Sequence, residues 1–131
     1  GIISADEIVI AGRTIRNSEL RRCIADRLNS LGMPPNLKGY GFLKLALCHT
    51  VRDNSLLYSL TTELYPLLAE ENETQPLRIE RVIRNAIEVT WQRGNLEAID
   101  RLFGYTVSDC RGRPTNAEFI ARLTDDILLH L

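Results

Sequence analysis

The sequence predicts an all-α domain, and three observations support this fold class. Apolar residues recur at helical spacing through most of the chain from residue 18 onward. Proline and glycine interrupt these segments at intervals that suit short helices joined by tight turns. The chain has 131 residues, of which 44% are hydrophobic and 25% charged, so a single domain can bury a sizeable core.

The first 17 residues differ from the rest of the chain. The stretch "DEIVIAGRTIRN" nearly alternates β-branched with polar residues around Ala11-Gly12, which predicts a short strand or hairpin, or else a linker. We therefore assign 1–17 to an N-terminal extension and 18–131 to the helical domain.

Helical periodicity begins at Ser18, the predicted N-cap of the first helix. Gly32 suits the position just past the end of that helix, and Pro34-Pro35 prevents the helix from continuing. Further helical segments are predicted over 38–52, 55–63, 66–72, 76–93, 95–103 and 116–129.

The segment 76–93 predicts a strongly amphipathic helix when its residues are placed at about 100° intervals. Its apolar side consists of Ile79, Val82, Ile83, Ala86, Ile87 and Thr90. Its polar side consists of Arg78, Glu80, Arg81, Arg84, Asn85 and Glu88. The polar side fits a solvated surface with Glu80–Arg84 and Arg84–Glu88 ion pairs, and it also fits a binding surface. Trp91 is expected to pack this helix onto the helix over 38–52.

A helix-turn-helix is predicted over about 66–93. The short helix 66–72 is followed by a turn and by Pro76, a residue that suits the first turn of a second helix. Ala69 is small enough for the two helices to cross closely. Asn72 is untypical, because this position in such turns is usually apolar.

In a helix-turn-helix the first turns of the second helix enter the major groove of DNA. Arg78 and Arg81 would then lie near guanine O6 and N7, which accept paired hydrogen bonds from a guanidinium group. Thr74 or Gln75 is placed to cap this helix or to contact the DNA backbone.

The positive charge of the chain is concentrated in this helix. Four arginines in 76–93, including Arg93, stand against two glutamates, so the segment carries 4 − 2 = +2, whereas the whole chain carries −1. A localised positive charge favours one specific site over indiscriminate coating of nucleic acid.

Four stretches identify a family that the chain resembles. They are "LGMPPNLKGYGFLKLAL", "LYPLLAEENET", "RIERVIRNAIEVTWQRGN" and "LFGYTVSDCRGRPTNAEFIA". From about residue 24 to its end, the chain resembles the C-terminal DNA-binding domain of the stage-zero sporulation response regulators, transcription factors of endospore-forming bacteria. The resemblance implies six helices with a central helix-turn-helix that binds short DNA boxes, often as head-to-tail tandem dimers.

The resemblance also implies roles for single residues. Arg78, Glu80 and Arg81 match the base-reading positions of the family, and Arg84 matches an arginine that contacts the DNA backbone. Asn85 stands where the family commonly has histidine.

The segment 95–105 resembles the family's contact surface for the housekeeping sigma factor of RNA polymerase, in a more charged version than usual. The residues expected on that surface are Asn95, Glu97, Asp100, Arg101 and Phe103. The implied partners are double-stranded DNA, the sigma factor and a second copy on DNA, with a cytoplasmic location and no membrane. Nothing in 1–17 matches the phosphoacceptor receiver domain that precedes this domain in the family.

No other constellation indicates an enzyme, a cofactor or a metal site. Cys23, Cys48 and Cys110 are widely spaced and are expected to be reduced thiols. His49 and His130 lack a second metal ligand at helical spacing.

Two alternatives stay open. Arg111 and Arg113 could reach phosphate or belong to a solvated loop. The whole chain could instead be a diverged regulatory module that binds proteins and no DNA.

Overall fold

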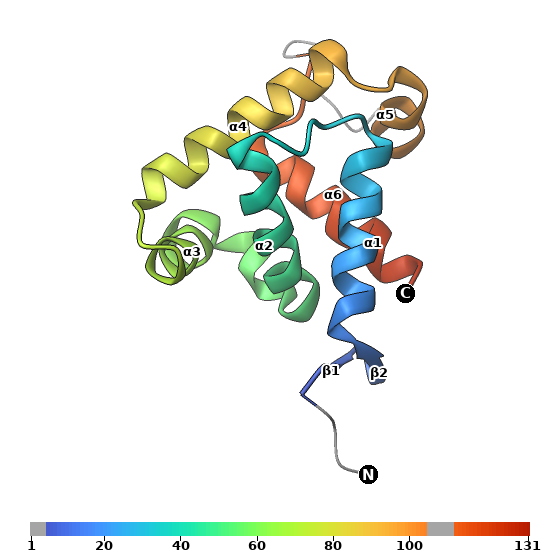
Figure 1. Ribbon diagram of the computed structural model, residues 1–131, viewed down its shortest axis with the longest axis vertical. Helices are drawn as coiled ribbons and strands as arrows, with labels where there is room; N and C mark the ends of the chain where they lie inside the picture. Colours follow the sequence, from blue (N-terminus) through green and yellow to red (C-terminus); the bar gives the residue numbers. More distant parts are fainter. Residues whose placement is uncertain (1–4, 105–111) are drawn as a thin grey trace.

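The computed structural model describes residues 5–104 and 112–131, which form a helical domain preceded by one hairpin (Figure 1). The antiparallel strands are β1 (Glu7–Ile10) and β2 (Arg13–Arg16). The helices are α1 (Asn17–Ser30), α2 (Lys38–Arg52), α3 (Tyr65–Glu71), α4 (Pro76–Arg93), α5 (Leu96–Phe103) and α6 (Asn116–Leu129). The six helices confirm the predicted fold class. Among the described residues, no helix has the length and apolarity to cross a membrane.

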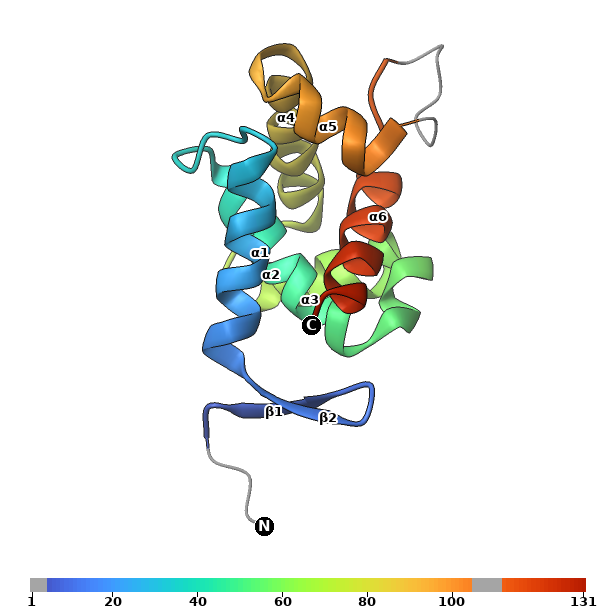
Figure 2. The ribbon, with the colours of Figure 1, turned by 90° about the vertical axis from the view of Figure 1, so that its right-hand side faces the viewer.

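The N-terminal residues form the hairpin that the sequence left as one alternative. Ala11 and Gly12 both have positive φ angles, 51° and 79°, as a two-residue type I′ turn requires. Figure 2 shows the hairpin at the opposite end of the molecule from α5. Ile10 is buried in the same core as the helices, so the hairpin packs on the helical body.

The two predicted ends of the first helix can be compared with the observed ends of α1. The prediction of Ser18 as N-cap was wrong: α1 begins at Asn17, and the Ser18 hydroxyl donates to Asp6 at 3.0 Å. The prediction for Gly32 was confirmed. Gly32 has φ +84°, its N–H donates to the Asn29 carbonyl, and the Met33 N–H donates to the Leu28 carbonyl. These paired bonds close the helix end.

The segment predicted as a helix over 55–63 is instead two short turns with a break between them. A 3₁₀ turn covers Asn54–Tyr58 and a π-helical turn covers Leu60–Leu64, which leads into α3. The Asp53 carboxylate accepts from the Ser55 N–H at 3.1 Å and starts the first turn. Ser59, with φ −145°, separates the two turns.

Helix α2 lies at the centre of the bundle and contacts α1, α4 and α6. Its crossing with α4 is very close, because a Cβ atom on Gly39 would lie 2.1 Å from the Val82 carbonyl oxygen and 2.6 Å from the Ala86 Cβ. Between α2 and α6, the Thr50 and Thr124 hydroxyls hydrogen-bond at 2.8 Å inside the core. The Thr124 hydroxyl also lies 2.7 Å from the Ile120 carbonyl oxygen, so both buried hydroxyls have hydrogen-bond partners.

An aromatic cluster joins the C-terminal end of α4 to the last two helices. The Trp91 ring lies 4.9 Å from the Phe103 ring and 6.0 Å from the Phe119 ring, measured between centroids. Both contacts have the edge-to-face geometry that aromatic pairs favour. The aromatic partners of Trp91 therefore come from α5 and α6, whereas the sequence predicted that it would pack onto α2.

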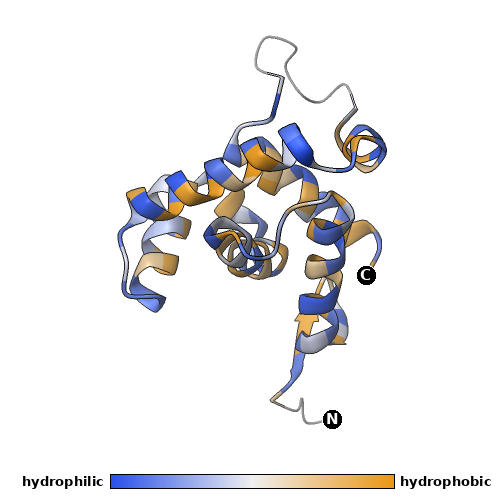
Figure 3. Ribbon diagram, turned by 45° about the horizontal axis from the view of Figure 1, so that its top comes forward, coloured by the Kyte–Doolittle hydropathy of each residue, from blue (hydrophilic) through white to orange (hydrophobic). Residues whose placement is uncertain are grey.

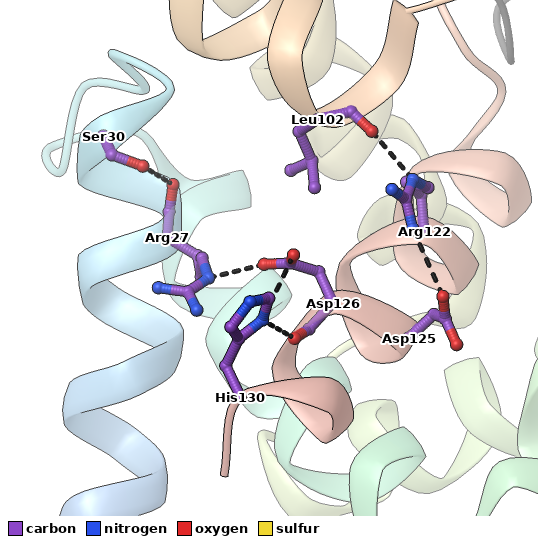
Figure 4. A network of polar contacts seen from close by, with 7 residues as sticks. All are labelled: Arg27, Ser30, Leu102, Arg122, Asp125, Asp126 and His130. Atoms are coloured by element: carbon purple, nitrogen blue, oxygen red, sulfur yellow. Dashed lines mark hydrogen bonds and ion pairs between the residues drawn. The ribbon is translucent and has the colours of Figure 1, made fainter.

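Polar contacts fix α6 to α1 and α5 (Figure 4). The Arg27 Nε donates to the Asp126 carboxylate at 2.6 Å, and Arg122 donates to the Leu102 carbonyl at 2.7 Å. His130 Nδ1 lies 2.7 Å from the Asp126 carbonyl oxygen. Asp126 is thus the point where α1 and the end of α6 meet.

The start of α6 is tied to both α3 and α4 by one side chain. The Asn116 amide donates to the Tyr65 hydroxyl at 3.2 Å and to the Glu80 carbonyl at 3.0 Å. Burial raises the pKa of the Tyr65 hydroxyl, so it stays protonated at neutral pH. Thr115 and Glu118 form a capping box that fixes the first turn of α6.

Replacing Gly39 by alanine should lower the free energy of unfolding by about 1–3 kcal/mol, because the new Cβ collides with α4 backbone. Urea unfolding measures this loss. Gly41→Ala is the matched control in the same helix, since a Cβ there meets no described atom within 4 Å. It should leave stability unchanged or raise it by up to about 1 kcal/mol. Equal stability of the two variants would contradict the close α2–α4 crossing.

Replacing Asn116 by alanine should lower the free energy of unfolding by about 1–3 kcal/mol, because the Tyr65 hydroxyl and the Glu80 carbonyl each lose a donor. The control is Asn85→Ala, an exposed site on α4 that should change stability by no more than about 0.5 kcal/mol. Chemical unfolding that gave the same midpoint for both variants would rule out the role of Asn116.

Candidate nucleic-acid interface

Helices α3 and α4 form the helix-turn-helix, with the turn over 72–75. Ala69 is buried where the helices approach, and its carbonyl accepts from the Thr74 N–H at 3.0 Å. Glu73 has φ +52°, which reverses the chain. The unusual Asn72 has a local explanation: its side-chain amide donates to the Leu68 carbonyl at 2.8 Å and so caps α3.

Helix α4 presents one side to the core and the other to solvent. Ile79, Ile83, Ala86 and Ile87 are buried. Figure 3 shows hydrophilic and hydrophobic residues alternating along the α4 ribbon. The exposed residues of the predicted site on this helix are Arg78, Arg81, Arg84, Asn85 and Arg93. The core side fixes α4 in place, so the solvent side has a defined orientation.

Arg78 and Arg81 are the arginines of α4 nearest to the turn. Within residues 5–104 and 112–131, neither guanidinium group takes part in an ion pair or a side-chain hydrogen bond. Both groups therefore remain available to a ligand that approaches the outward face of α4.

Three other charged residues of α4, Glu80, Arg84 and Glu88, take part in ion pairs. Arg84 Nη1 lies 2.5 Å from Glu80 Oε1, as the sequence predicted. The predicted Arg84–Glu88 pair does not form, because the Glu88 carboxylate instead accepts from Arg113 at 2.8 Å. Arg113 thus fastens the segment before α6 to the middle of α4.

The N-terminal end of α4 directly follows the turn over 72–75. Gln75 is its N-cap residue, and no side chain of the described residues caps the helix there. Capping by the Thr74 or Gln75 side chain, one of the two predicted alternatives, is therefore not observed, and contact of these residues with the DNA backbone stays a prediction. Pro76 occupies the first position and has no N–H to satisfy. Within the described residues, the Arg78 and Ile79 N–H groups donate to the Gln75 carbonyl, which leaves the Leu77 N–H, together with the helix dipole, for a phosphate group.

Arg93 lies at the far end of the same helix. Fifteen residues separate it from Arg78, which corresponds to about 22 Å along the helix axis. The structure therefore does not bring Arg93 together with the arginines near the turn. Any contact of Arg93 with a ligand is a separate contact.

The surface expected to contact the sigma factor lies on α5 and just before it. Glu97, Asp100 and Arg101 are exposed. The Asn95 side chain accepts from the Ala98 N–H at 3.2 Å and so serves as the cap of α5. Phe103 requires a correction: its ring is only 2% exposed and stacks on Phe119 at 5.5 Å. Phe103 belongs to the core and is not part of a contact surface.

The structure adds one exposed residue that the sequence analysis did not single out. Leu77 is 64% exposed in the first turn of α4. Helical periodicity could have predicted this exposure. At about 100° per residue, Leu77 lies about 40° from Arg81 around the helix axis and far from the apolar side.

The remaining candidates have structural explanations. Burial raises the pKa of the Cys23 and Cys48 thiols, so both stay protonated at neutral pH and are poor nucleophiles. His49 lies 3.4 Å from Glu71, across α2 and α3. Among the described residues, no three potential metal ligands gather into one cluster. Cys110 and Arg111 lie outside the described residues.

Comparison with known protein families shows which family the chain matches. The family described as "Sporulation initiation factor Spo0A C terminal" matches residues 24–127, which include all six helices in whole or in part. The match covers the helix-turn-helix and the aromatic cluster, and it confirms the resemblance drawn from the four sequence stretches. The chain belongs to the Spo0A C-terminal domain family, which consists of DNA-binding transcription factor domains and not of enzymes.

Proposed function

We propose that this chain is a sequence-specific regulator of transcription that reads the major groove of DNA with α4. The observation that carries the proposal is the pair of exposed guanidinium groups of Arg78 and Arg81, which have no ion-pair partner among the described residues, on a helix whose other side is buried. The major groove admits an α-helix, and a guanidinium group can donate two hydrogen bonds to guanine O6 and N7. Family membership supports DNA as the ligand.

Asn85 and Glu80 extend the proposed reading surface. Asn85 is exposed two turns after Arg78, and an asparagine amide can pair with adenine N6 and N7. Glu80 could accept from cytosine N4, but its carboxylate is held by Arg84. Reading by Glu80 therefore requires Arg84 to move toward a phosphate, which would release the carboxylate.

The DNA backbone is the proposed ligand of a second set of groups. The first turn of α4 offers the Leu77 N–H beside Thr74 and Gln75, and Arg84 and Arg93 offer charge. The net charge of −1 keeps the sequence-independent attraction small. Base contacts must then supply much of the preference for one site. The proposal places the protein in the cytoplasm, with the DNA that it reads.

A protein partner is proposed for the exposed face of α5. Glu97 and Asp100 are acidic and exposed, and Leu96 beside them is 75% exposed. This combination suits a contact with the sigma factor. A second copy of the chain bound to an adjacent DNA box is a further proposed partner. The same face supports the alternative function, a regulatory module that binds proteins without binding DNA.

Arg81→Ala should weaken binding to a duplex selected from a random-sequence library by about 1–3 kcal/mol and relax specificity at one base pair. Fluorescence anisotropy at fixed salt measures both effects, with a scrambled duplex as reference. Arg21→Ala is the matched control, since Arg21 is exposed on α1 and should leave binding nearly unchanged. Equal affinity of the unsubstituted protein for selected and scrambled DNA would refute sequence-specific reading and leave the protein-binding alternative.

Arg84→Ala should behave differently from Arg81→Ala, because its proposed contact is a phosphate. Affinity should fall by a similar factor on selected and scrambled duplexes. The slope of log affinity against log salt concentration should decrease by about one, the value for one lost phosphate contact. A loss confined to the selected duplex, at unchanged slope, would assign Arg84 to base reading instead.

A further inference from the structure

Leu77 is the large apolar side chain that α4 exposes among the described residues. It is 64% exposed, whereas the neighbouring residues of the outward face are arginine, asparagine and glutamate. A single exposed leucine is ordinary on a protein surface. Leu77 is nevertheless a candidate binding residue, because it lies in the first turn of the helix proposed to enter the major groove of DNA.

The geometry of α4 places Leu77 beside Arg81. Residues four apart on a helix are neighbours on one face, about 6 Å apart along the axis. Base pairs in DNA are stacked about 3.4 Å apart. A helix that directs Arg81 toward a base edge therefore directs Leu77 toward a base edge within about two base pairs of it.

We propose that Leu77 contacts the C5-methyl group of a thymine in the major groove and makes the chain prefer a T·A pair at that position. This inference rests on the proposed function and adds a specificity-determining residue to it. Thymine is the base that presents an apolar group in the major groove, and apolar side chains recognise that methyl group.

The other base edges fit Leu77 less well. Guanine, adenine and cytosine present donors and acceptors there, which a leucine side chain would shield from water without replacing their hydrogen bonds. The contact therefore selects thymine in two ways, by burying apolar surface against the methyl group and by disfavouring the polar edges.

The test replaces each thymine of the selected duplex by deoxyuridine, one position at a time, which removes only the methyl group. Binding is measured for the unsubstituted protein and for Leu77→Ala. For the unsubstituted protein, one position should weaken binding by about fourfold, the factor expected for one buried methyl-sized group. For Leu77→Ala, the same replacement should have no effect, while all other positions should behave as before. That position should lie within about two base pairs of the one that responds to Arg81→Ala.

Leu129→Ala is the matched control, because Leu129 is 71% exposed on α6, away from α4. It should retain the methyl dependence of the unsubstituted protein. Identical deoxyuridine profiles for the unsubstituted protein and Leu77→Ala, or no methyl dependence at any position, would overturn the inference while leaving sequence-specific binding intact. A library selection that yields no preferred duplex would overturn the proposed function and this inference together.

Discussion

The burial of the apolar side of α4 is the constraint on which the rest of the structure depends. Ile79, Ile83 and Ile87 are sealed in the core, and α2 crosses so closely that only glycine fits at position 39. A helix held this tightly cannot rotate about its axis without exposing its apolar side. The outward direction of Arg78 and Arg81 is therefore a consequence of core packing, with no contact of their own required.

Polar contacts then hold the frame around α4. Asn116 joins the start of α6 to α3 and α4, and the Arg113–Glu88 pair joins the preceding segment to the middle of α4. In the part of the chain that the structure describes, these contacts do not involve the side chains of Arg78 and Arg81. The charges that hold the fold and the charges proposed to bind DNA are thus different residues of the same helix, so a ligand can take Arg78 and Arg81 without loosening the bundle.

The overall charge of −1 is compatible with DNA binding because charge acts locally. The proposed reading face combines guanidinium groups, an amide and one leucine, a mixture that matches the polar and apolar groups of the major groove. The acidic groups of α5 lie outside this face and suit a protein partner. One small domain can in this way offer separate surfaces to DNA and to a protein.

The sequence by itself determined the helices whose ends carry local signals. Pro76 marks the start of α4 and Gly32 marks the end of α1, because backbone preferences act within a few residues. The alternation in 1–17 indicated a strand or hairpin but left a linker open. The exposed side of α4 followed from helical periodicity, as did the Glu80–Arg84 pair one turn apart.

Only the tertiary structure decided the contacts between distant parts of the chain. Glu88 pairs with Arg113 and not with Arg84, Phe103 is buried, and Trp91 meets α5 and α6. None of these follows from spacing along one helix, because each depends on which elements the folded core brings together.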